Sequence, residues 1–102
     1  MLELIKKIFK GNKTNFKSLV ENGAVIVDVR SNPEFRSGHI KGALNIPVEQ
    51  VKTKINDLKK MNKPVITCCK SGMRSGMAAS ILSSAGLEVY NGGAWNILQG
   101  KI

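Results

Sequence analysis

Apolar residues are arranged along this chain in short runs and spaced sets, and each of them predicts a strand or a helix. Two runs are almost continuously apolar or β-branched, residues 24–29 (Ala-Val-Ile-Val-Asp-Val) and residues 64–69 (Pro-Val-Ile-Thr-Cys-Cys). Such runs are typical of strands that are covered on both faces in a parallel sheet. Residues 43–46 and 87–90 predict two further short strands, set off by glycine or proline.

Helices are predicted where apolar residues recur every three or four positions. The first is a short, basic amphipathic helix in an N-terminal extension, residues 1–12, which Gly11 ends. The others lie within residues 14–22, after Ser31, over residues 48–62, and around Met77 to Ala85. Because helices alternate with strands, we expect one α/β domain over residues 13–102, with a parallel sheet and helices on both faces.

Length and composition narrow the class of protein. A chain of 102 residues fits a single domain, and we expect a monomer. The formal net charge is +9, from 16 basic and 7 acidic side chains, but only three of the basic residues are arginine. We therefore expect a solvated lysine shell that steers small anions or an acidic partner, and no nucleic-acid site.

No stretch of the sequence predicts a membrane-spanning helix or a secretory signal. The chain lacks ~20 consecutive apolar residues, and no small-residue cleavage site follows its N-terminal apolar residues. We expect a cytoplasmic protein without stable membrane insertion; a periplasmic location is the alternative if a signal has been trimmed. One histidine and two adjacent cysteines, Cys68 and Cys69, cannot supply tetrahedral metal coordination without another chain, so we expect no metal and no cofactor.

The loop after residues 64–69 carries the candidate chemistry. It leads directly into a helix, so its backbone N–H groups and those of the helix N-terminus can converge on an anion. Cys69 opens the loop, where such donors stabilise a thiolate, lower the thiol pKa and make a nucleophile. Alternation along the strand places Cys68 on the opposite face, as a core residue. The candidate anion-binding residues are Lys70, Ser71, Gly72, Met73, Arg74 and Ser75.

Several groups of residues occur in a fixed order: Asp28-Val29-Arg30, Glu34-Phe35, Gly-His-Ile-Lys-Gly-Ala-Leu-Asn-Ile-Pro (38–47), Cys-Lys-Ser-Gly-Met-Arg-Ser (69–75), Asn91-Gly92-Gly93 and Trp95. Together they resemble the ordered motifs of a single-domain rhodanese, over about Phe16 to Leu98. The resemblance implies a five-stranded parallel sheet and sulfurtransferase activity. In that family the loop cysteine takes a sulfane sulfur from thiosulfate or a persulfide and passes it to cyanide or a thiol. The resemblance implies two partners. One is a small anionic sulfur donor, and the other is a thiol protein that accepts the sulfur, either thioredoxin-like or part of a sulfur relay.

Some assignments stay open at this level. The resemblance implies that Asp28 and Arg30 brace the active loop, and a plain ion pair at the strand end is the alternative. His39 is either a general base or a structural hydrogen-bonding residue. Two rival functions remain, a non-catalytic rhodanese-like interaction module and a cysteine-based phosphatase or arsenate reductase. The second rival uses Cys-x₅-Arg, whereas four residues separate Cys69 from Arg74 here.

Overall fold

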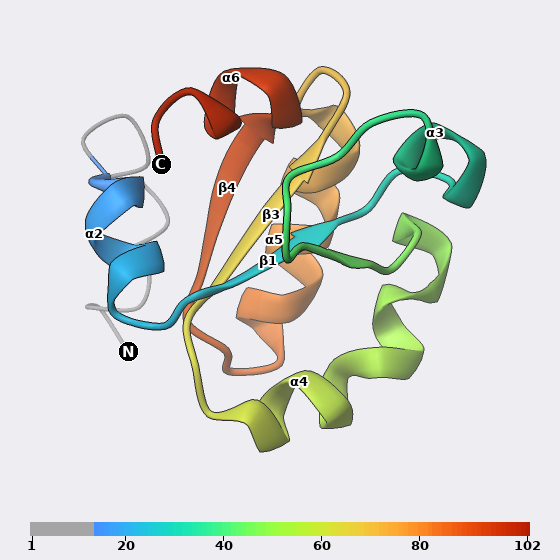
Figure 1. Cartoon of the computed structure of the whole chain (residues 1–102). Helices are drawn as coiled ribbons and strands as arrows, with labels where there is room; N and C mark the ends of the chain where they lie inside the picture. The colour runs from blue at the N-terminus through green and yellow to red at the C-terminus, as the bar shows by residue number, and fades with distance from the viewer. Residues whose placement is uncertain (1–13) are drawn as a thin grey trace.

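A computed structural model describes residues 14–102 (Figure 1). The helix predicted for residues 1–12 lies outside the described residues. The described chain alternates strands and helices, as the hydrophobic pattern predicts. In order, the elements are α2 (Phe16–Glu21), β1 (Val25–Asp28), α3 (Asn32–Arg36), β2 (Leu44–Asn45), the 3₁₀ helix η2 (Val48–Lys54), α4 (Ile55–Met61), β3 (Val65–Cys69), α5 (Met73–Ser84), β4 (Val89–Ala94) and α6 (Trp95–Gln99).

The four strands of the described residues form one parallel sheet in the order β2-β1-β3-β4. The α/β class and the parallel sheet are confirmed. The fifth strand implied by the rhodanese resemblance is not found within residues 14–102, where the hydrophobic pattern itself marks four strands. In the register, Asp28 lies opposite Cys68, and Cys69 lies opposite Ala94. The central strands therefore bring Asp28 and both cysteines to the same, carboxyl edge of the sheet.

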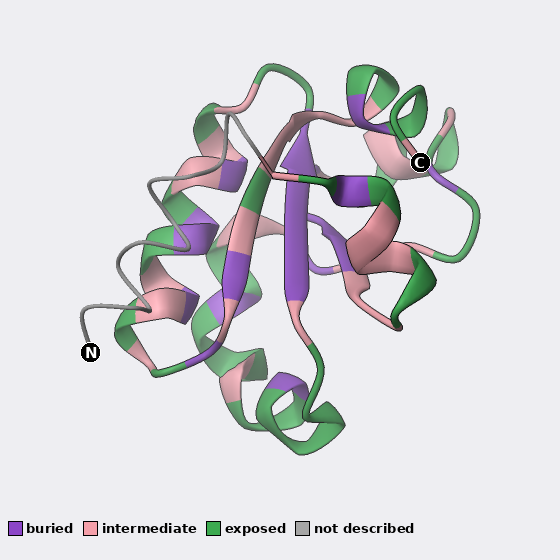
Figure 2. Cartoon of the chain, turned by 90° about the vertical axis from the view of Figure 1, so that its left-hand side faces the viewer, coloured by how far each residue is buried: buried purple, intermediate pink, exposed green. Residues whose placement is uncertain are grey.

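Helices cover both faces of the sheet, and β3 is buried along its whole length (Figure 2). Alternate strand residues separate into two core clusters. Cys69 packs with residues of α5, η2 and α4 on one face. Cys68 packs on the other face, with Phe16 of α2 and Leu98 of α6. The predicted separation of the adjacent cysteines is thus present in the fold.

The helix end predicted near Asn62 is confirmed, but two other details of the predicted helices differ from the structure. The helix predicted over residues 48–62 is a 3₁₀ helix followed by α4, and Asn62 ends α4 with a positive φ of 54°. The apolar spacing of three from Val48 to Val51 fits the three residues per turn of a 3₁₀ helix. Met77, predicted on the apolar face of α5, is 58% exposed.

The last strand also extends further than its apolar run. It continues through Gly92 and Gly93 to Ala94, with a register irregularity opposite Thr67 to Cys69. A Cβ at residue 92 would lie 2.8 Å from the Thr67 carbonyl oxygen and 2.8 Å from Leu98 Cδ2. Glycine is therefore required here for β4 to approach β3 closely, and it does not mark the end of the strand.

Candidate active site

Cys69 lies at the end of β3, where the chain turns into α5. Cys69 is buried, with 1% of its surface exposed. The backbone N–H of Gly72 donates to Cys69 Sγ at 3.0 Å, and the backbone N–H of Ser75 donates at 3.3 Å. Gly72 has a positive φ of 105° and is the N-cap of α5, a conformation that glycine adopts without strain. The loop and the first turn of α5 therefore direct two N–H groups at one sulfur atom.

These donors change the acidity of the Cys69 thiol. Burial by itself raises its pKa, but the Ser75 hydroxyl and the backbone N–H groups of Ser75, Gly72 and Ser71 act in the opposite direction. Together they leave the pKa of Cys69 below its ordinary value. Cys68 differs: burial and the nearby Asp28 carboxylate raise its pKa to about 12. The two adjacent cysteines are thus chemically distinct, and Cys69 is the one that forms a thiolate readily.

Ser75 is fully buried and contacts the sulfur through its side chain as well as its N–H. Its Oγ lies 3.4 Å from Cys69 Sγ and 3.0 Å from the Gly72 carbonyl oxygen. Asn91 of β4 accepts from the same hydroxyl at 2.7 Å. The residue pattern gave Asn91 no role; the signal for it was its place in Asn91-Gly92-Gly93, directly after the apolar run of residues 87–90.

Arg74 does not lie free beside the sulfur, as an anion-binding role predicts. Its Nη1 and Nη2 donate to the two carboxylate oxygens of Glu34 at 2.8 and 3.1 Å. Glu34 also accepts from the N–H and hydroxyl of Ser31 in a capping box at the start of α3. The Arg74 guanidinium and the Ser31 donors hold the pKa of Glu34 down at about 2. Arg74 therefore joins the first turn of α5 to α3.

Asp28 and Arg30 form a buried ion pair beside Cys68. Arg30 Nη2 donates to Asp28 Oδ2 at 2.7 Å and to the Gly38 carbonyl oxygen at 2.7 Å, and the guanidinium lies 4.8 Å from the centre of the Trp95 ring. Within residues 14–102, the hydrogen bonds of these two side chains join them to each other, to the Arg30 backbone N–H and to the Gly38 carbonyl oxygen, and none of these bonds reaches the loop after Cys69. The ion pair therefore stabilises the connection between α3 and β2 through Gly38, and it fixes the guanidinium against the Trp95 ring.

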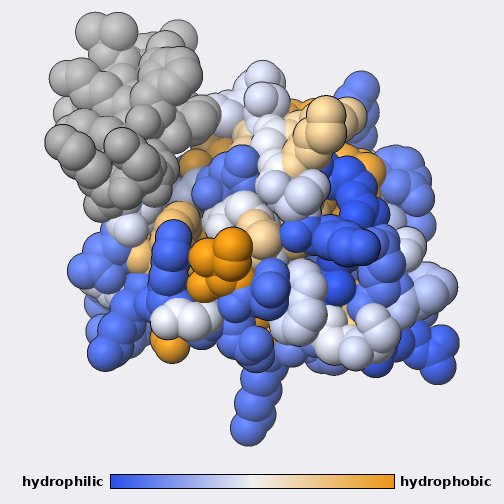
Figure 3. All heavy atoms as spheres, turned by 90° about the horizontal axis from the view of Figure 1, so that it is seen from above, coloured by the Kyte–Doolittle hydropathy of each residue, from blue (hydrophilic) through white to orange (hydrophobic). Residues whose placement is uncertain are grey.

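The remaining predicted residues lie around the rim. Lys70, Ser71 and Met73 are exposed, with Met73 at 80%. His39 stacks on Phe35 at 3.7 Å between ring centres, and its Nδ1 lies 2.7 Å from the Phe35 carbonyl oxygen, which is a structural contact. Figure 3 shows the molecule from above in Figure 1, the side to which the strands point, and hydrophilic side chains cover most of that face.

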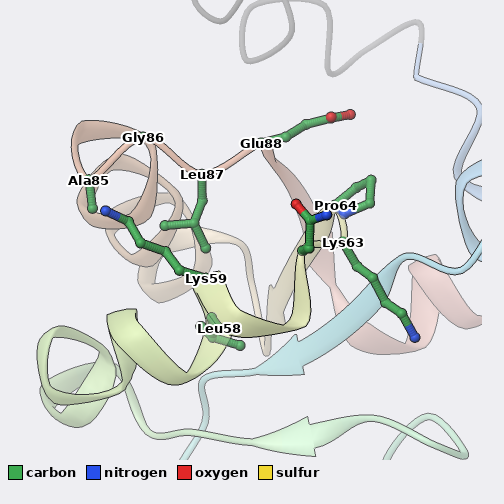
Figure 4. Close-up of a pocket in the computed structure, with 9 residues that line it drawn as sticks. Leu58, Lys59, Lys63, Pro64, Ala85, Gly86, Leu87 and Glu88 are labelled. Atoms are coloured by element: carbon green, nitrogen blue, oxygen red, sulfur yellow. The ribbon is translucent and has the colours of Figure 1, made fainter.

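A cavity of about 440 Å³ lies at the other edge of the sheet (Figure 4). Pro64 and Glu88, which line it, directly precede β3 and β4. It is therefore at the amino ends of the strands, far from Cys69 at the carboxyl end of β3.

Within residues 14–102, no three His, Cys, Asp or Glu side chains are grouped to hold a metal ion. No helix of that part of the chain is long and apolar enough to cross a membrane.

Comparisons with known proteins agree with this geometry. The chain is 45% identical over 69 residues to the uncharacterized protein YqhL of Bacillus subtilis, covering 67% of this chain and 54% of that one. It is 37% identical over 76 residues to the thiosulfate sulfurtransferase GlpE of Pseudomonas fluorescens, covering 74% of this chain and 69% of GlpE. The structure resembles that of a rhodanese with anions from E. coli, with a TM-score of 0.66 and 34% identity over 72% of this chain and 89% of that chain.

The matched region spans little more than half the length of YqhL and of a second relative, YibN of E. coli. Within this chain, however, the family signal is extensive. The sequence model of the rhodanese-like domain matches residues 12–97, which include every strand of the sheet, the Cys69 loop and α5. The chain therefore belongs to the rhodanese-like domain family.

Proposed function

We propose that this chain is a sulfurtransferase that uses Cys69 as its nucleophile and carries sulfur as a Cys69 persulfide. The observation that carries the proposal is the convergence of the Gly72 and Ser75 N–H groups on Cys69 Sγ, at 3.0 and 3.3 Å. Such donors stabilise a thiolate at neutral pH without a histidine base. The similarity to thiosulfate sulfurtransferases supports the same chemistry.

In the first step, the Cys69 thiolate attacks the outer sulfur of thiosulfate. A sulfur–sulfur bond to Cys69 forms as the sulfur–sulfur bond of the donor breaks, and sulfite leaves with the electron pair. In the second step, cyanide or a thiolate attacks the outer sulfur of the persulfide, and the Cys69 thiolate leaves. Two-electron chemistry at sulfur balances both steps without a cofactor.

The loop from Lys70 to Ser75 would hold the persulfide anion with its N–H groups. Lys70 is exposed on this loop and would attract the anionic donor. Arg74 would act mainly by fixing the loop, because its guanidinium already pairs with Glu34. As the acceptor we propose a thiol protein or a small thiol, and as the compartment the cytoplasm, where thiols are kept reduced.

The rival phosphatase function finds less support in this geometry. Four residues separate Cys69 from Arg74, and both terminal nitrogens of the guanidinium are bound to the Glu34 carboxylate. A tetrahedral phosphate needs a wider loop and a free arginine. We therefore expect no Cys69-dependent hydrolysis of an aryl phosphate.

Turnover of thiosulfate and cyanide to thiocyanate and sulfite tests the proposal. The wild type and Cys68→Ser should both form thiocyanate, and Cys69→Ser should form none above background. The matched pair separates the nucleophile from its buried neighbour. Equal turnover by wild type and Cys69→Ser would refute the role of Cys69. No turnover by the wild type with cyanide or with a thiol acceptor would refute the proposal in favour of an interaction module.

A further inference from the structure

The Ser75 hydroxyl faces more acceptors than its single proton can serve. A serine hydroxyl donates one hydrogen bond and accepts two. Here the Gly72 carbonyl oxygen lies at 3.0 Å, the Asn91 Oδ1 at 2.7 Å, and Cys69 Sγ at 3.4 Å. Both oxygens act only as acceptors, and the sulfur becomes one when it ionises. Cys69 and Asn91 thus compete for the same proton.

The Asn91 amide is held in the orientation that presents its oxygen to Ser75. The backbone N–H of Gly93 donates to the same Oδ1 at 3.0 Å, so this side of the amide must be the oxygen. The opposite side, Nδ2, faces α5 at Gly76, where an added Cβ would lie 3.3 Å from it. Glycine is unfavourable within a helix relative to alanine, and at residue 76 it leaves room for this amide.

We propose that Asn91 is a positioning residue that controls whether Ser75 gives its proton to Cys69. With Cys69 as a thiol, the S–H donates to Ser75 Oγ and the hydroxyl donates to Asn91 Oδ1. With Cys69 as a thiolate, the hydroxyl turns to the sulfur, and Asn91 keeps only the Gly93 N–H. The S–H bond is the one covalent bond that breaks, and its proton leaves to solvent.

The role rests on the proposed function, in which Cys69 is the reacting group. By accepting from Ser75, Asn91 stabilises the thiol relative to the thiolate and so keeps the thiolate more basic. More basic thiolates are better nucleophiles. When the persulfide forms, the negative charge moves to the outer sulfur, and Ser75 is free to return to Asn91. The asparagine thus favours both the attack and the loaded state.

Other charged and titratable groups act on the same sulfur, and none of them differs between the variants that are compared below. Arg74 of α5 lies near enough to interact with a Cys69 thiolate, and Glu34 of α3 neutralises that guanidinium. Cys68 of β3 and Asp28 of β1 lie on the other side of the strand, and a charge on Cys68 interacts with Cys69. None of these groups contacts Asn91 in the hydrogen bonds of residues 14–102.

Titration of the Cys69 thiolate by its ultraviolet absorbance tests the proposal. All variants carry Cys68→Ala, which leaves Cys69 as the one thiol of the chain. Asn91→Leu should move the titration midpoint to lower pH by roughly 0.5 or more, because a neutral hydrogen bond is worth about 1 kcal/mol and 1.36 kcal/mol corresponds to one pH unit. Ser75→Ala should move the midpoint to higher pH. Asn96→Leu, at an exposed asparagine on α6, is the matched control and should not move it.

The double variant separates a specific role from a merely structural one. In a Ser75→Ala background, Asn91→Leu should no longer change the midpoint, since the shared hydroxyl is gone. An unchanged midpoint in Asn91→Leu alone, or an equal change with and without Ser75, would overturn the proposal. The titration needs no sulfur donor, so a chain that titrates as expected but accepts no sulfur refutes the proposed function and leaves this result standing.

Discussion

At the scale of single residues, the behaviour of Cys69 depends on donors that come from its own loop. Burial disfavours a charge on the sulfur, and the N–H groups of Gly72, Ser75 and Ser71 with the Ser75 hydroxyl more than compensate. Cys68, one residue earlier, is buried next to Asp28, and burial and that carboxylate raise its pKa. One step along a strand therefore separates a reactive thiol from a core residue.

The first prediction concerns this difference. The rate of alkylation by iodoacetamide should reach half its maximum at a pH below ~8.5, the value for a free thiol, because the thiolate is the reacting form. Cys68→Ser should leave the profile unchanged, and Cys69→Ser should remove the reaction. Peptide mapping of the alkylated protein provides the measurement. A half-maximum at or above the free-thiol value would contradict the assigned donors.

A second prediction concerns the close approach at Gly92. Gly92→Ala should lower the free energy of unfolding by about 2 kcal/mol, since the added methyl group meets the Thr67 backbone and the core residue Leu98. Gly100→Ala is the matched control, because residue 100 has a helical φ of −73° and only an ordinary contact at 3.5 Å. Urea denaturation of both variants gives the comparison. Equal stability of the two would show that β4 can shift without cost.

At the scale of elements, the Arg74–Glu34 pair connects helices that are far apart in the sequence. Arg74 is in the first turn of α5, and Glu34 is in the first turn of α3. Both side chains are 34% exposed, so solvent screens the pair. The pair therefore contributes modestly to stability and chiefly fixes where α3 lies against the active loop.

The third prediction follows from the low pKa of Glu34. A carboxylate with a depressed pKa contributes stability above its ordinary value of 4.5 and loses it as the pH falls towards about 2. Glu34→Gln should therefore cost about 1 kcal/mol at neutral pH, the upper end for an exposed pair. Its difference in Tm from the wild type should shrink as the pH falls through this window. Glu49→Gln, at an exposed carboxylate of η2, controls for the loss of a surface charge.

The elements also show what the sequence could predict. The apolar runs at residues 24–29 and 64–69 predicted the two central strands, because burial on both faces leaves a continuous local pattern. The separation of Cys68 from Cys69 was also predictable, because successive side chains of a strand point to opposite faces of the sheet. The length of β4 was missed, since Gly92 and Gly93 were interpreted as a break, whereas they permit close contact with β3.

The site was only partly predictable. Cys69 and its loop were found because a strand, a tight turn and a helix follow one another directly. Glu34 and Asn91 stand in motifs that the sequence analysis singled out, but those motifs do not reveal their partners, because Arg74 and Ser75 lie 40 and 16 positions away. Such pairs depend on how the elements pack, and this also explains why Arg74 was expected to be free for an anion.

At the scale of the whole molecule, the net charge of +9 attracts anions to the protein as a whole. Because Glu34 offsets Arg74, the attraction of an anionic donor depends on the lysines as a group. Lysines dispersed over a small domain create a positive potential that extends about 10 Å at ~0.1 M salt. The charge should therefore affect how fast an anion arrives more than how the sulfur reacts.

The fourth prediction tests this steering. The rate constant for loading Cys69 from thiosulfate should fall roughly threefold or more as NaCl rises from ~0.01 to ~0.5 M. Alkylation of the same cysteine by neutral iodoacetamide should change little, which makes it the internal control. Stopped reactions analysed by mass spectrometry give both rates. Equal salt dependence for the two reagents would remove the proposed role of the lysines.

The central claim is that Cys69 carries the transferred sulfur. The most direct measurement is the mass of the intact protein after incubation with thiosulfate and removal of the excess. The wild type and Cys68→Ser should each gain one sulfur atom, which a reducing thiol removes, and Cys69→Ser should gain none. A wild type that gains no sulfur, or a Cys69→Ser variant that gains as much as the wild type, would contradict the account.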